Sequence, residues 1–367
     1  MSKTDISETG TPFILYGELY TTYKEVATEI KRKTNCIVDK KYLSKIGDVV
    51  IPTSGETPEE IATATCVMTP NVILAGDLNI FRINDIDGRF FSYVINHKVN
   101  KDISRIAQGK SIVHIKGEEI SKIQIKYPSD KEQQKILSFI ELLSLKIEKQ
   151  GQLIDKLKKY KRGSLSALFP KKGEITPQYR FAGFTKPWEQ RKLGDVFTER
   201  TERANGDEEL LSVTIGNGVI RQVDSDKRNI ASEDKSNYKI VHKGDVPYNS
   251  MRMWQGAVGN SEYDGIVSPA YTVLVPSKEA NGKFFMELFK KESTLKIFQR
   301  WSQGLTSDTW NLKYPVLSTI EISIPRIEEQ KRISDYFATL DHLITLHQHK
   351  YDTLLSLKNA ILQQMFI

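Results

Sequence analysis

The chain has 367 residues with 53 basic and 46 acidic side chains, and this length predicts two or three folded units, each large enough to bury its own core. The first ten residues lack a signal-peptide pattern and no apolar run approaches the ~20 residues that cross a bilayer, which predicts a cytoplasmic protein without a membrane span. Cys36 and Cys66 are too few for a disulfide framework or a four-thiolate zinc site, so we expect no redox role and no metal.

Residues 1–128 mix short apolar runs with turn signals. This pattern is typical of an α+β module that contains a twisted sheet. A helix is predicted near residues 90–99, and strands are predicted at residues 49–51, 72–74, 79–81, 112–115 and 123–125.

Residues 129–168 are predicted to form one long helix that begins just after Pro128, with Asp130 in its first turn. From Ile136 onward, seam positions recur at alternating spacings of four and three residues. This period of 3.5, held over about four heptads, is typical of a coiled coil, so the helix should pack lengthwise against a partner. The seam positions are Ile136, Ile140, Leu143, Ile147, Gln150, Ile154 and Leu157.

A turn-rich stretch, residues 169–187, predicts a linker that separates the first helix from a second α+β module at residues 188–325. In that module, strands are predicted at residues 271–275 and 320–324, and a helix at residues 282–298.

A second long helix, residues 326–367, follows the second module. Its seam positions are Ile333, Phe337, Leu340, Ile344, His347, Tyr351 and Leu354. The chain therefore repeats itself, as two copies of one architecture. At an offset of 197 residues, Pro128 matches Pro325, Gly47-Asp48-Val49 matches Gly244-Asp245-Val246 and Phe169 matches Phe366, while Gln108-Gly109 matches Gln303-Gly304 at an offset of 195.

The two matched seams favour mutual pairing of the helices as an antiparallel coiled coil with pseudo-twofold symmetry, which would separate the two modules. The alternative is that each helix packs on its own module. A helix from Ile136 to Leu165 rises roughly 44 Å, more than one B-DNA turn of about 34–36 Å, so both modules could reach one duplex. Gln150 and His347 occupy matched seam positions, where they either form a hydrogen-bonded pair that fixes the register or face solvent.

The positive charge lies mainly in the first helix and the linker. Residues 129–168 carry nine basic and five acidic side chains, whereas residues 1–128 and 193–325 together carry 33 and 34. If the modules bind DNA, they do so through local patches, and weakly when alone.

Four segments carry a resemblance to a known family. Residues 47–57 and 76–82 resemble the first target-recognition domain of type I restriction-modification specificity subunits, and residues 244–256 and 303–312 resemble the second. Together with both helix starts, the resemblance covers nearly the whole chain. One departure is Arg191-Lys192-Leu193-Gly194-Asp195, which resembles the usual opening of such a domain and has no counterpart at the start of the chain, so the first module is expected to be shortened.

The resemblance implies a non-catalytic DNA-binding subunit. Each recognition domain would read one half of a split target in double-stranded DNA, and the paired helices would set the gap between the halves. The helices would also dock two methyltransferase subunits, to which translocating restriction subunits attach.

The candidate DNA-reading residues lie in two loops of each module, because polar side chains on exposed turns can reach base edges. Arg252 suits guanine, and Gln255 or Asn249 suits adenine. For any single candidate a purely structural role is the alternative, above all for Trp254, which like Trp310 is of a type that more often packs. The first module supplies Thr53, Ser54, Glu56, Thr57, Gln108, Lys110, Ser111 and His114; the second supplies Asn249, Ser250, Arg252, Trp254, Gln255, Gln303, Thr306, Ser307, Asp308, Thr309 and Asn311.

Enzyme motifs are absent from the sequence. Residues 108–111 superficially resemble a phosphate-binding loop, but Ser104 stands where that motif requires glycine, and Gly216-Asn217-Gly218 is too short for a dinucleotide site. No histidine pair has the HExxH spacing of a zinc site. A stand-alone nuclease and a purely structural coiled-coil adaptor remain the alternatives to a DNA-reading scaffold, and we expect no catalytic residue and no cofactor.

Overall fold

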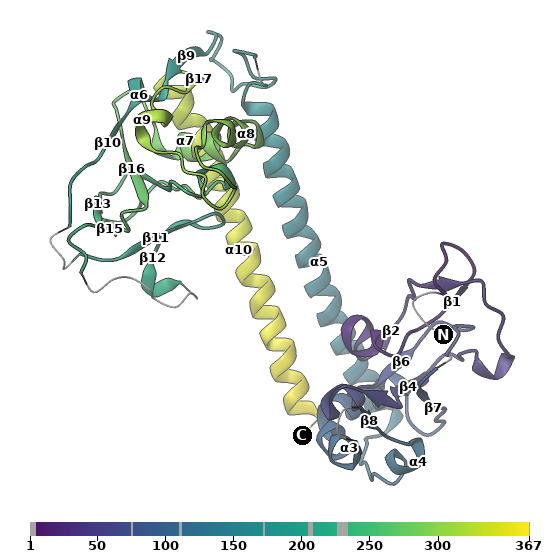
Figure 1. Ribbon diagram of the computed structural model, residues 1–367. Coiled ribbons are helices and arrows are strands. Elements are labelled where there is room, and N and C mark those ends of the chain that lie inside the picture. Colours follow the sequence, from purple (N-terminus) through teal and green to yellow (C-terminus); the bar gives the residue numbers. More distant parts are fainter. Residues whose placement is uncertain are drawn as a thin grey trace. The chain divides into compact units, whose positions relative to one another are not determined.

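The computed structural model describes residues 5–74, 76–109, 112–171, 173–204, 208–225 and 234–366. The chain forms two compact units. Unit 1 comprises Met1–Gly151 with His349–Ile367, and unit 2 comprises Gln152–Gln348. Each unit therefore holds one globular module together with a part of each long helix. Helices and strands are mixed in both units, which confirms the predicted α+β class (Figure 1).

A four-stranded sheet with the order β2-β6-β4-β7 lies in unit 1. Its central strand β4 (Asp48–Pro52) is buried throughout and pairs antiparallel with β6 (Thr65–Val67) and β7 (Leu78–Phe81), while β2 (Val26–Ala27) runs parallel to β6. Alternate side chains of a strand point to opposite faces. Accordingly, Val50 lies in one apolar core and its two neighbours in β4 lie in another.

The other elements of unit 1 are short and surround this sheet. They are β1 (Thr11–Pro12), η2 (Leu19–Tyr23), β3 (Lys33–Thr34), η3 (Lys40–Tyr42), β5 (Ser54–Gly55), α1 (Pro58–Ile61), α2 (Gly88–Val94), η4 (Ile95–Val99), α3 (Asn100–Ile106), β8 (Val113–His114) and α4 (Gly117–Ile120).

Unit 2 contains a three-stranded sheet with the order β10-β16-β14. Strand β16 (Tyr271–Pro276) pairs antiparallel with β10 (Phe197–Glu199) on one side and with β14 (Val246–Asn249) on the other. Helix α7 (Gly282–Lys290) places Phe284, Phe285, Leu288 and Phe289 on one face, as the helical period requires, and all four are buried in the main core of the unit.

Within the described residues of unit 2, three two-stranded ribbons accompany this sheet and pair β11 with β12, β13 with β15 and β9 with β17. The remaining elements are β9 (Glu189–Lys192), α6 (Leu193–Val196), β11 (Leu211–Thr214), β12 (Gly218–Arg221), η5 (Gln222–Asp224), β13 (Lys239–Val241), η6 (Met253–Gln255), β15 (Gly265–Val267), α8 (Glu292–Trp301), α9 (Tyr314–Leu317) and β17 (Glu321–Ile324).

The two long helices are α5 (Asp130–Leu168) and α10 (Ile327–Met365), each of 39 residues. Their bounds lie within a few residues of the predicted ranges 129–168 and 326–367. Among the described ranges, no helix is long and apolar enough to span a membrane.

In unit 1, the first turns of α5 pack against the last turns of α10. Ile140 lies in one buried cluster with Leu362. Further along α5, the backbone of Gly151 lies against the ring of Tyr351 on α10. A Cβ added to residue 151 would be 3.4 Å from that ring. Rising residue numbers on α5 meet falling numbers on α10, so the two segments run antiparallel within this unit.

The same direction holds within unit 2, where the last turns of α5 pack against the first turns of α10. Lys161 Nζ lies 2.8 Å from a carboxylate oxygen of Asp341, and the hydroxyls of Ser164 and Tyr336 lie 2.9 Å apart. The ammonium of Lys161 also reaches Glu287 on α7 at 3.0 Å. Each unit thus contains its own antiparallel segment of helix pair.

A phenylalanine follows or ends each long helix and enters an apolar core. Phe169, directly after α5, is fully buried in unit 2, with its ring centroid 5.3 Å from that of Phe284 on α7. Phe366, directly after α10, is buried in unit 1, with its ring centroid 5.4 Å from that of Phe90 on α2. Each helix therefore ends in the core of the unit in which the other helix begins.

Most of the proposed seam positions are shielded from solvent. Gln150 belongs to unit 1 and His347 to unit 2, and their pairing stays a prediction. On α5, Ile140, Leu143, Ile147, Gln150 and Ile154 are buried and Ile136 and Leu157 are half-buried; on α10, Ile333, Phe337 and Leu340 are buried and Ile344, His347, Tyr351 and Leu354 are half-buried.

Some predicted elements are wrong. Residues 72–74 form no strand, because Ile73 makes only single bridges to Phe13 and Leu43. The helix predicted at residues 282–298 is two helices, α7 and α8, since the backbone is extended at Lys291.

Residues 123–125 also form no strand, although their counterparts in unit 2 lie in and beside β17. Strand β17 exists because it pairs with β9 over the full register Glu321–Ile324. Among the described residues, no strand pairs with residues 123–125. A local apolar pattern cannot make a strand unless a partner strand satisfies its backbone groups.

Candidate nucleic-acid interface

A buried aspartate stands at the start of a sheet strand in each unit. Asp48 in unit 1 and Asp245 in unit 2 are related by the offset of 197, and both are almost inaccessible to solvent. Arg82 lies 3.1 Å from Asp48, and Arg200 lies 2.8 Å from Asp245. The hydrogen bonds to Asp245 raise the pKa of the Arg200 guanidinium. The repeated Gly-Asp motif is therefore structural and fixes the strand that leads into the first candidate loop.

In unit 1, the two candidate loops lie side by side. The first loop continues into β5 and the second contains β8, and these strands pair antiparallel with Ser54 opposite His114. The N–H of Ile115 donates to the carbonyl of Thr53 at 3.0 Å. Two segments that are far apart in the sequence thus form one local surface.

In unit 2, the N–H of Leu312 donates to the carbonyl of Ser250 at 2.9 Å. Tyr248, which is fully buried, donates its hydroxyl to the carbonyl of Leu312 at 3.0 Å, and its burial raises its pKa. Trp254 and Trp310 meet edge to face with ring centroids 5.2 Å apart. These contacts anchor the second loop of the unit on the first.

The hydrogen bond that joins the loops is the same in both units. The donor residues Ile115 and Leu312 are 197 residues apart, and so are the acceptor residues Thr53 and Ser250. The sequence repeat is therefore also a repeat of the loop geometry.

The base of the second loop repeats as well. Gln108 and His114 exchange two backbone hydrogen bonds in unit 1, as Gln303 and Asn311 do in unit 2.

Directly after the first residue of each such pair stands a glycine, Gly109 with φ +140° and Gly304 with φ +148°. A Cβ at these positions would lie only 2.0 Å from the carbonyl oxygen of Ile112 or 2.6 Å from that of Thr309. Glycine is required at both places, because only glycine adopts this backbone without a side-chain clash.

Most of the predicted DNA-reading residues can reach solvent. Lys110 and Ser111 lie outside the described residues. Those exposed are Glu56, Thr57, Gln108, His114, Arg252, Gln303, Thr306, Ser307, Asp308 and Thr309, and those half-buried are Thr53, Ser54, Asn249, Trp254, Gln255 and Asn311.

Ser250 departs from the expectation. It is buried, and its hydroxyl lies 2.8 Å from that of Thr272 on the adjacent strand β16. Strand alternation could have predicted this, since Val246, Tyr248 and Ser250 fall on one face. Ser250 therefore shapes the loop and is withdrawn as a base-reading side chain.

Several other candidates use one polar group inside their own loop. Asn311 Oδ1 is buried without a hydrogen-bond partner among the described residues, so this acceptor does not face solvent. The hydrogen bonds are from Glu60 N–H to Thr57 Oγ1 (3.2 Å), which caps α1, from Met251 N–H to Asn249 Oδ1 (3.0 Å), from Trp254 Nε1 to the Met251 carbonyl (3.1 Å) and from Thr309 Oγ1 to the Thr306 carbonyl (2.9 Å).

Comparison with known families shows to which family the chain with this repeated loop pair belongs. Residues 2–159 and 185–356 each match the family model described as the type I restriction modification DNA specificity domain. The chain belongs to this family. The two matched segments correspond to the two copies of the repeat, and the resemblance drawn from the loop sequences is confirmed.

Individual relatives are distant. The type I restriction enzyme HindI specificity subunit of Haemophilus influenzae is 22% identical over 187 residues, which span 49% of this chain and 41% of the length of that relative. The S subunit of a type I restriction-modification system from M. genitalium has a similar fold, with a TM-score of 0.55 and 14% identity over 100% of this chain and 91% of that one. A chain of another solved type I R-M system is 16% identical, with a TM-score of 0.51 over 91% and 83% of the two chains.

A buried glutamine joins each long helix of this family member to its module. This role is not predicted from the sequence. Gln133 accepts a hydrogen bond from the N–H of Asp87, which precedes α2, and donates to the carbonyl of Pro128. Gln330 likewise accepts from the N–H of Asn281, which precedes α7. The matched Glu-Gln helix starts were a signal for this role, but the partner residues could not be read from a local pattern.

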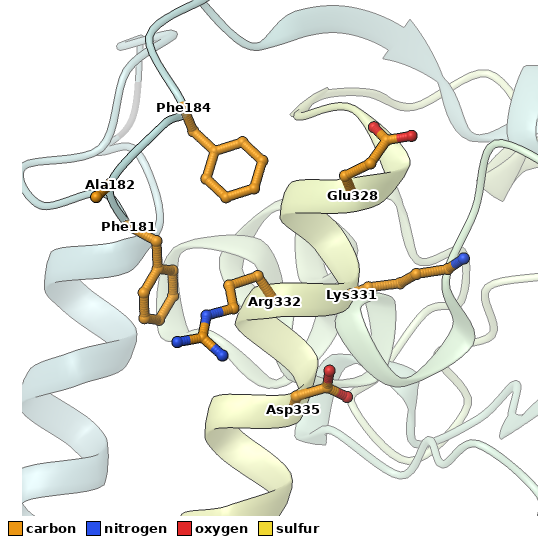
Figure 2. Close-up of a pocket in the computed structure, with 7 residues that line it drawn as sticks. All are labelled: Phe181, Ala182, Phe184, Glu328, Lys331, Arg332 and Asp335. Atoms are coloured by element: carbon orange, nitrogen blue, oxygen red, sulfur yellow. The ribbon is translucent and has the colours of Figure 1, made fainter.

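Figure 2 shows a pocket of about 370 Å³ in unit 2, whose lining includes none of the candidate loop residues. The linker contributes Phe181 and Phe184, and the first turns of α10 contribute charged side chains of both signs. The guanidinium of Arg332 lies over the ring of Phe181, 5.2 Å from its centroid. Within the described part of the chain, no group of three or more His, Cys, Asp or Glu side chains is placed to hold a metal ion.

Proposed function

We propose that this member of the type I specificity family is the non-catalytic, DNA-reading subunit of a type I restriction-modification complex. The observation that carries the proposal is the repetition of one loop pair, with the same joining hydrogen bond, in both units. Each loop pair reads one half of a bipartite target in double-stranded DNA. The proposal includes a cytoplasmic location, since chromosomal DNA is the substrate of such a complex.

The chemistry of the exposed side chains supports reading of base edges. Arg252 can donate two parallel hydrogen bonds to O6 and N7 of guanine, and the amide of Gln255 can both donate to and accept from adenine. Neither group is buried, and Arg252 Nη1 lies 3.5 Å from Gln255 Oε1. The other proposed readers are Thr53, Ser54, Glu56, Thr57, Gln108, Lys110, Ser111, His114, Asn249, Trp254, Gln303, Thr306, Ser307, Asp308, Thr309 and Asn311.

The nearly neutral modules point to partner subunits. Phosphate contacts by lysine and arginine dominate the affinity of proteins for DNA. Residues 1–128 and 193–325 carry 33 basic and 34 acidic side chains, so they offer little net attraction to the DNA backbone. Partner subunits of the complex supply the missing positive charge.

The outer faces of the long helices support docking of two methyltransferase subunits, one on each unit. In unit 1, Phe139, Leu142 and Leu145 on α5 are 48, 54 and 44% exposed. In unit 2, Tyr160 on α5 and Leu346 on α10 are 59 and 50% exposed. A two-stranded coiled coil buries only its seam, and further apolar side chains on its outside favour contact with additional helices. The length of the paired helices then sets the gap between the half-sites.

The test is co-expression with the methyltransferase subunit of the same complex, followed by sequencing of methylated DNA. We expect one bipartite motif with a fixed gap, and co-purification of the two subunits. A coiled-coil adaptor would co-purify without sequence-dependent methylation, and methylation without a motif would contradict the proposal.

A docking variant sharpens this test. The double change Leu142→Glu with Leu145→Glu should abolish both co-purification and methylation, because it places two charges on the proposed contact. Lys146→Glu, an exposed position on the same part of α5, is the matched control and should retain both. Unchanged co-purification of the double variant would exclude this face as the docking surface.

A further inference from the structure

Leu305 is a fully exposed leucine in the second candidate loop of unit 2. The residues around it, Gln303, Thr306, Ser307 and Asp308, are polar and exposed. A single apolar side chain at full exposure among hydrogen-bonding groups is an isolated contact point rather than part of an apolar patch.

The loop holds Leu305 in a fixed position. The two backbone hydrogen bonds between Gln303 and Asn311, 3.0 and 2.8 Å long, close the base of the loop. Inside it, the N–H of Thr306 donates to Thr309 Oγ1 at 3.1 Å, and Gly304 has the φ of +148° that a Cβ would not permit. The side chain is therefore presented by a constrained turn.

We propose that Leu305 is a specificity-determining residue that contacts the C5-methyl group of a thymine. This inference rests on the proposed function, in which the loop faces base edges. Among the groups that base pairs display in the major groove, the thymine methyl is the apolar one, and aliphatic side chains recognise thymine through it. A leucine beside hydrogen-bonding side chains matches a thymine beside hydrogen-bonding base edges.

The repeat predicts that only one half-site has this property. At the offset of 195 that relates the two second loops, Leu305 corresponds to Lys110 in the first module. The tip of a lysine side chain is a strongly hydrated ammonium group, which does not match an apolar methyl group as the end of a leucine does. Methyl recognition should therefore be confined to the half-site that the second module reads.

Thymine-to-deoxyuridine replacement tests the contact, because it removes only the methyl group. The methyltransferase–specificity complex is titrated with duplexes that carry its motif, as defined by sequencing of methylated DNA, and each thymine of each half-site is replaced in turn. For the unaltered protein we expect one replacement in the second module's half-site to weaken binding about fourfold, the ratio that corresponds to loss of one buried methyl group.

Leu305→Ala should bind the thymine duplex about fourfold more weakly and show no further loss with deoxyuridine at that position. Leu305→Met should restore part of the difference. Val223→Ala, at an 81% exposed position on η5 outside both loops, is the matched control and should keep the deoxyuridine effect.

Three outcomes overturn the inference. The first is the absence of a deoxyuridine-sensitive position in the unaltered protein, and the second is a sensitive position that Leu305→Ala leaves unchanged. The third is a uniform loss of affinity on every sequence in Leu305→Ala, which would show an unspecific wedge between bases. A complex without any sequence preference would instead overturn the proposed function itself, so the two failures are distinguishable.

Discussion

Gln133 and Gln330 join the start of each long helix to the helix that packs beside it. Gln330 is inaccessible to solvent, and its amide satisfies the N–H of Asn281 and the carbonyls of Glu279 and Pro325, each at 2.9 Å. A buried polar group that loses its partner costs far more than an average hydrogen bond contributes. This residue should therefore matter for stability rather than for DNA reading.

We predict that Gln330→Met lowers the free energy of unfolding of unit 2 by about 3 kcal/mol, because it leaves three buried or part-buried backbone groups without their partner. All four tryptophans, Trp188, Trp254, Trp301 and Trp310, belong to unit 2, so tryptophan fluorescence during urea unfolding reports on this unit. Lys331→Met, at the exposed neighbouring position, is the control and should change little. Equal effects of the two variants would refute the role of Gln330 in joining α10 to the segment that precedes α7.

Asp87 makes the stability of unit 1 depend on pH. Burial by itself raises the pKa of Asp87, but the hydrogen bonds from Arg89 and Gln134 outweigh burial and hold the pKa below its ordinary value of 3.8. A carboxyl with a lowered pKa stabilises the fold above the ordinary value, and this contribution is lost as the pH falls through the lowered pKa. The matched residue in unit 2 is Asn281, which caps α7 without a charge.

We predict that Asp87→Asn lowers the stability of unit 1 by about 1 kcal/mol at pH 7, and that the difference from the unaltered protein decreases below pH 3.8 and is lost as the pH falls through the lowered pKa. Thermal unfolding of both proteins, followed by far-ultraviolet circular dichroism, measures this stability difference. A range of about pH 2 to 7 covers the titration of the carboxyl. A difference that stays constant over the whole range would show that the carboxylate charge contributes nothing.

The sequence predicted which loops form the candidate site better than it predicted the roles of their residues. Loop positions follow from the repeat and from turn signals, which are local. Whether a side chain can contact DNA depends on its neighbours in space. The Ser250 hydroxyl is hydrogen-bonded to that of Thr272 on β16, and the Thr57 hydroxyl caps α1. The Thr57 role was readable, since threonine before Pro58 and three residues before Glu60 is a helix-start signature.

At the scale of elements, the ends of the long helices anchor the units. Phe169 and Phe366 are both buried among aromatic side chains, although they stand at the very end of their helices. A large apolar side chain in such a position binds the helix end to the core. The end of α5 is therefore an integral part of unit 2, and the end of α10 is an integral part of unit 1.

We predict that Phe169→Ala lowers the free energy of unfolding of unit 2 by about 4 kcal/mol and shifts the fluorescence transition, while Phe366→Ala has a similar cost in unit 1. Because unit 1 has no tryptophan, the second effect should appear in circular dichroism and leave the fluorescence transition in place. Tyr160→Ala, at an exposed position on α5, is the control. Effects no larger than that of the control would contradict the anchoring role.

The helix seams could be predicted from the sequence because a period of 3.5 is a local and sustained signal. On α5 it located the buried run from Ile140 to Ile154, whereas Leu137 is more buried than Ile136 at the start and Leu157 is half-buried at the end. The short strands could not be predicted as well. Residues 123–125 and β17 have similar apolar patterns, and the difference between them lies in a partner strand.

We propose that the protein consists of two copies of one DNA-reading module, which share two helices of 39 residues. Within each unit the helix segments run antiparallel, which is what a spacer built from two like halves requires. If the helices set the gap between half-sites, their length determines the number of base pairs in that gap.

We predict that insertion of one heptad after Gly151 in α5 and another after Lys350 in α10 lengthens the tolerated gap. Seven residues add about 10 Å of helix, which corresponds to roughly three base pairs of B-DNA. Sequencing of methylated DNA from cells that express the lengthened chain with its methyltransferase gives the gap directly. An unchanged gap would show that helix length does not determine the spacing of the half-sites.

In the proposed function, each module reads its own half of the target. The most direct measurement is the methylated motif of a chain in which residues 188–325 are replaced by the corresponding module of another family member, co-expressed with the same methyltransferase. We expect one half of the motif to change, while the other half and the gap stay as they were. A motif in which both halves change, or neither does, would contradict the proposed function.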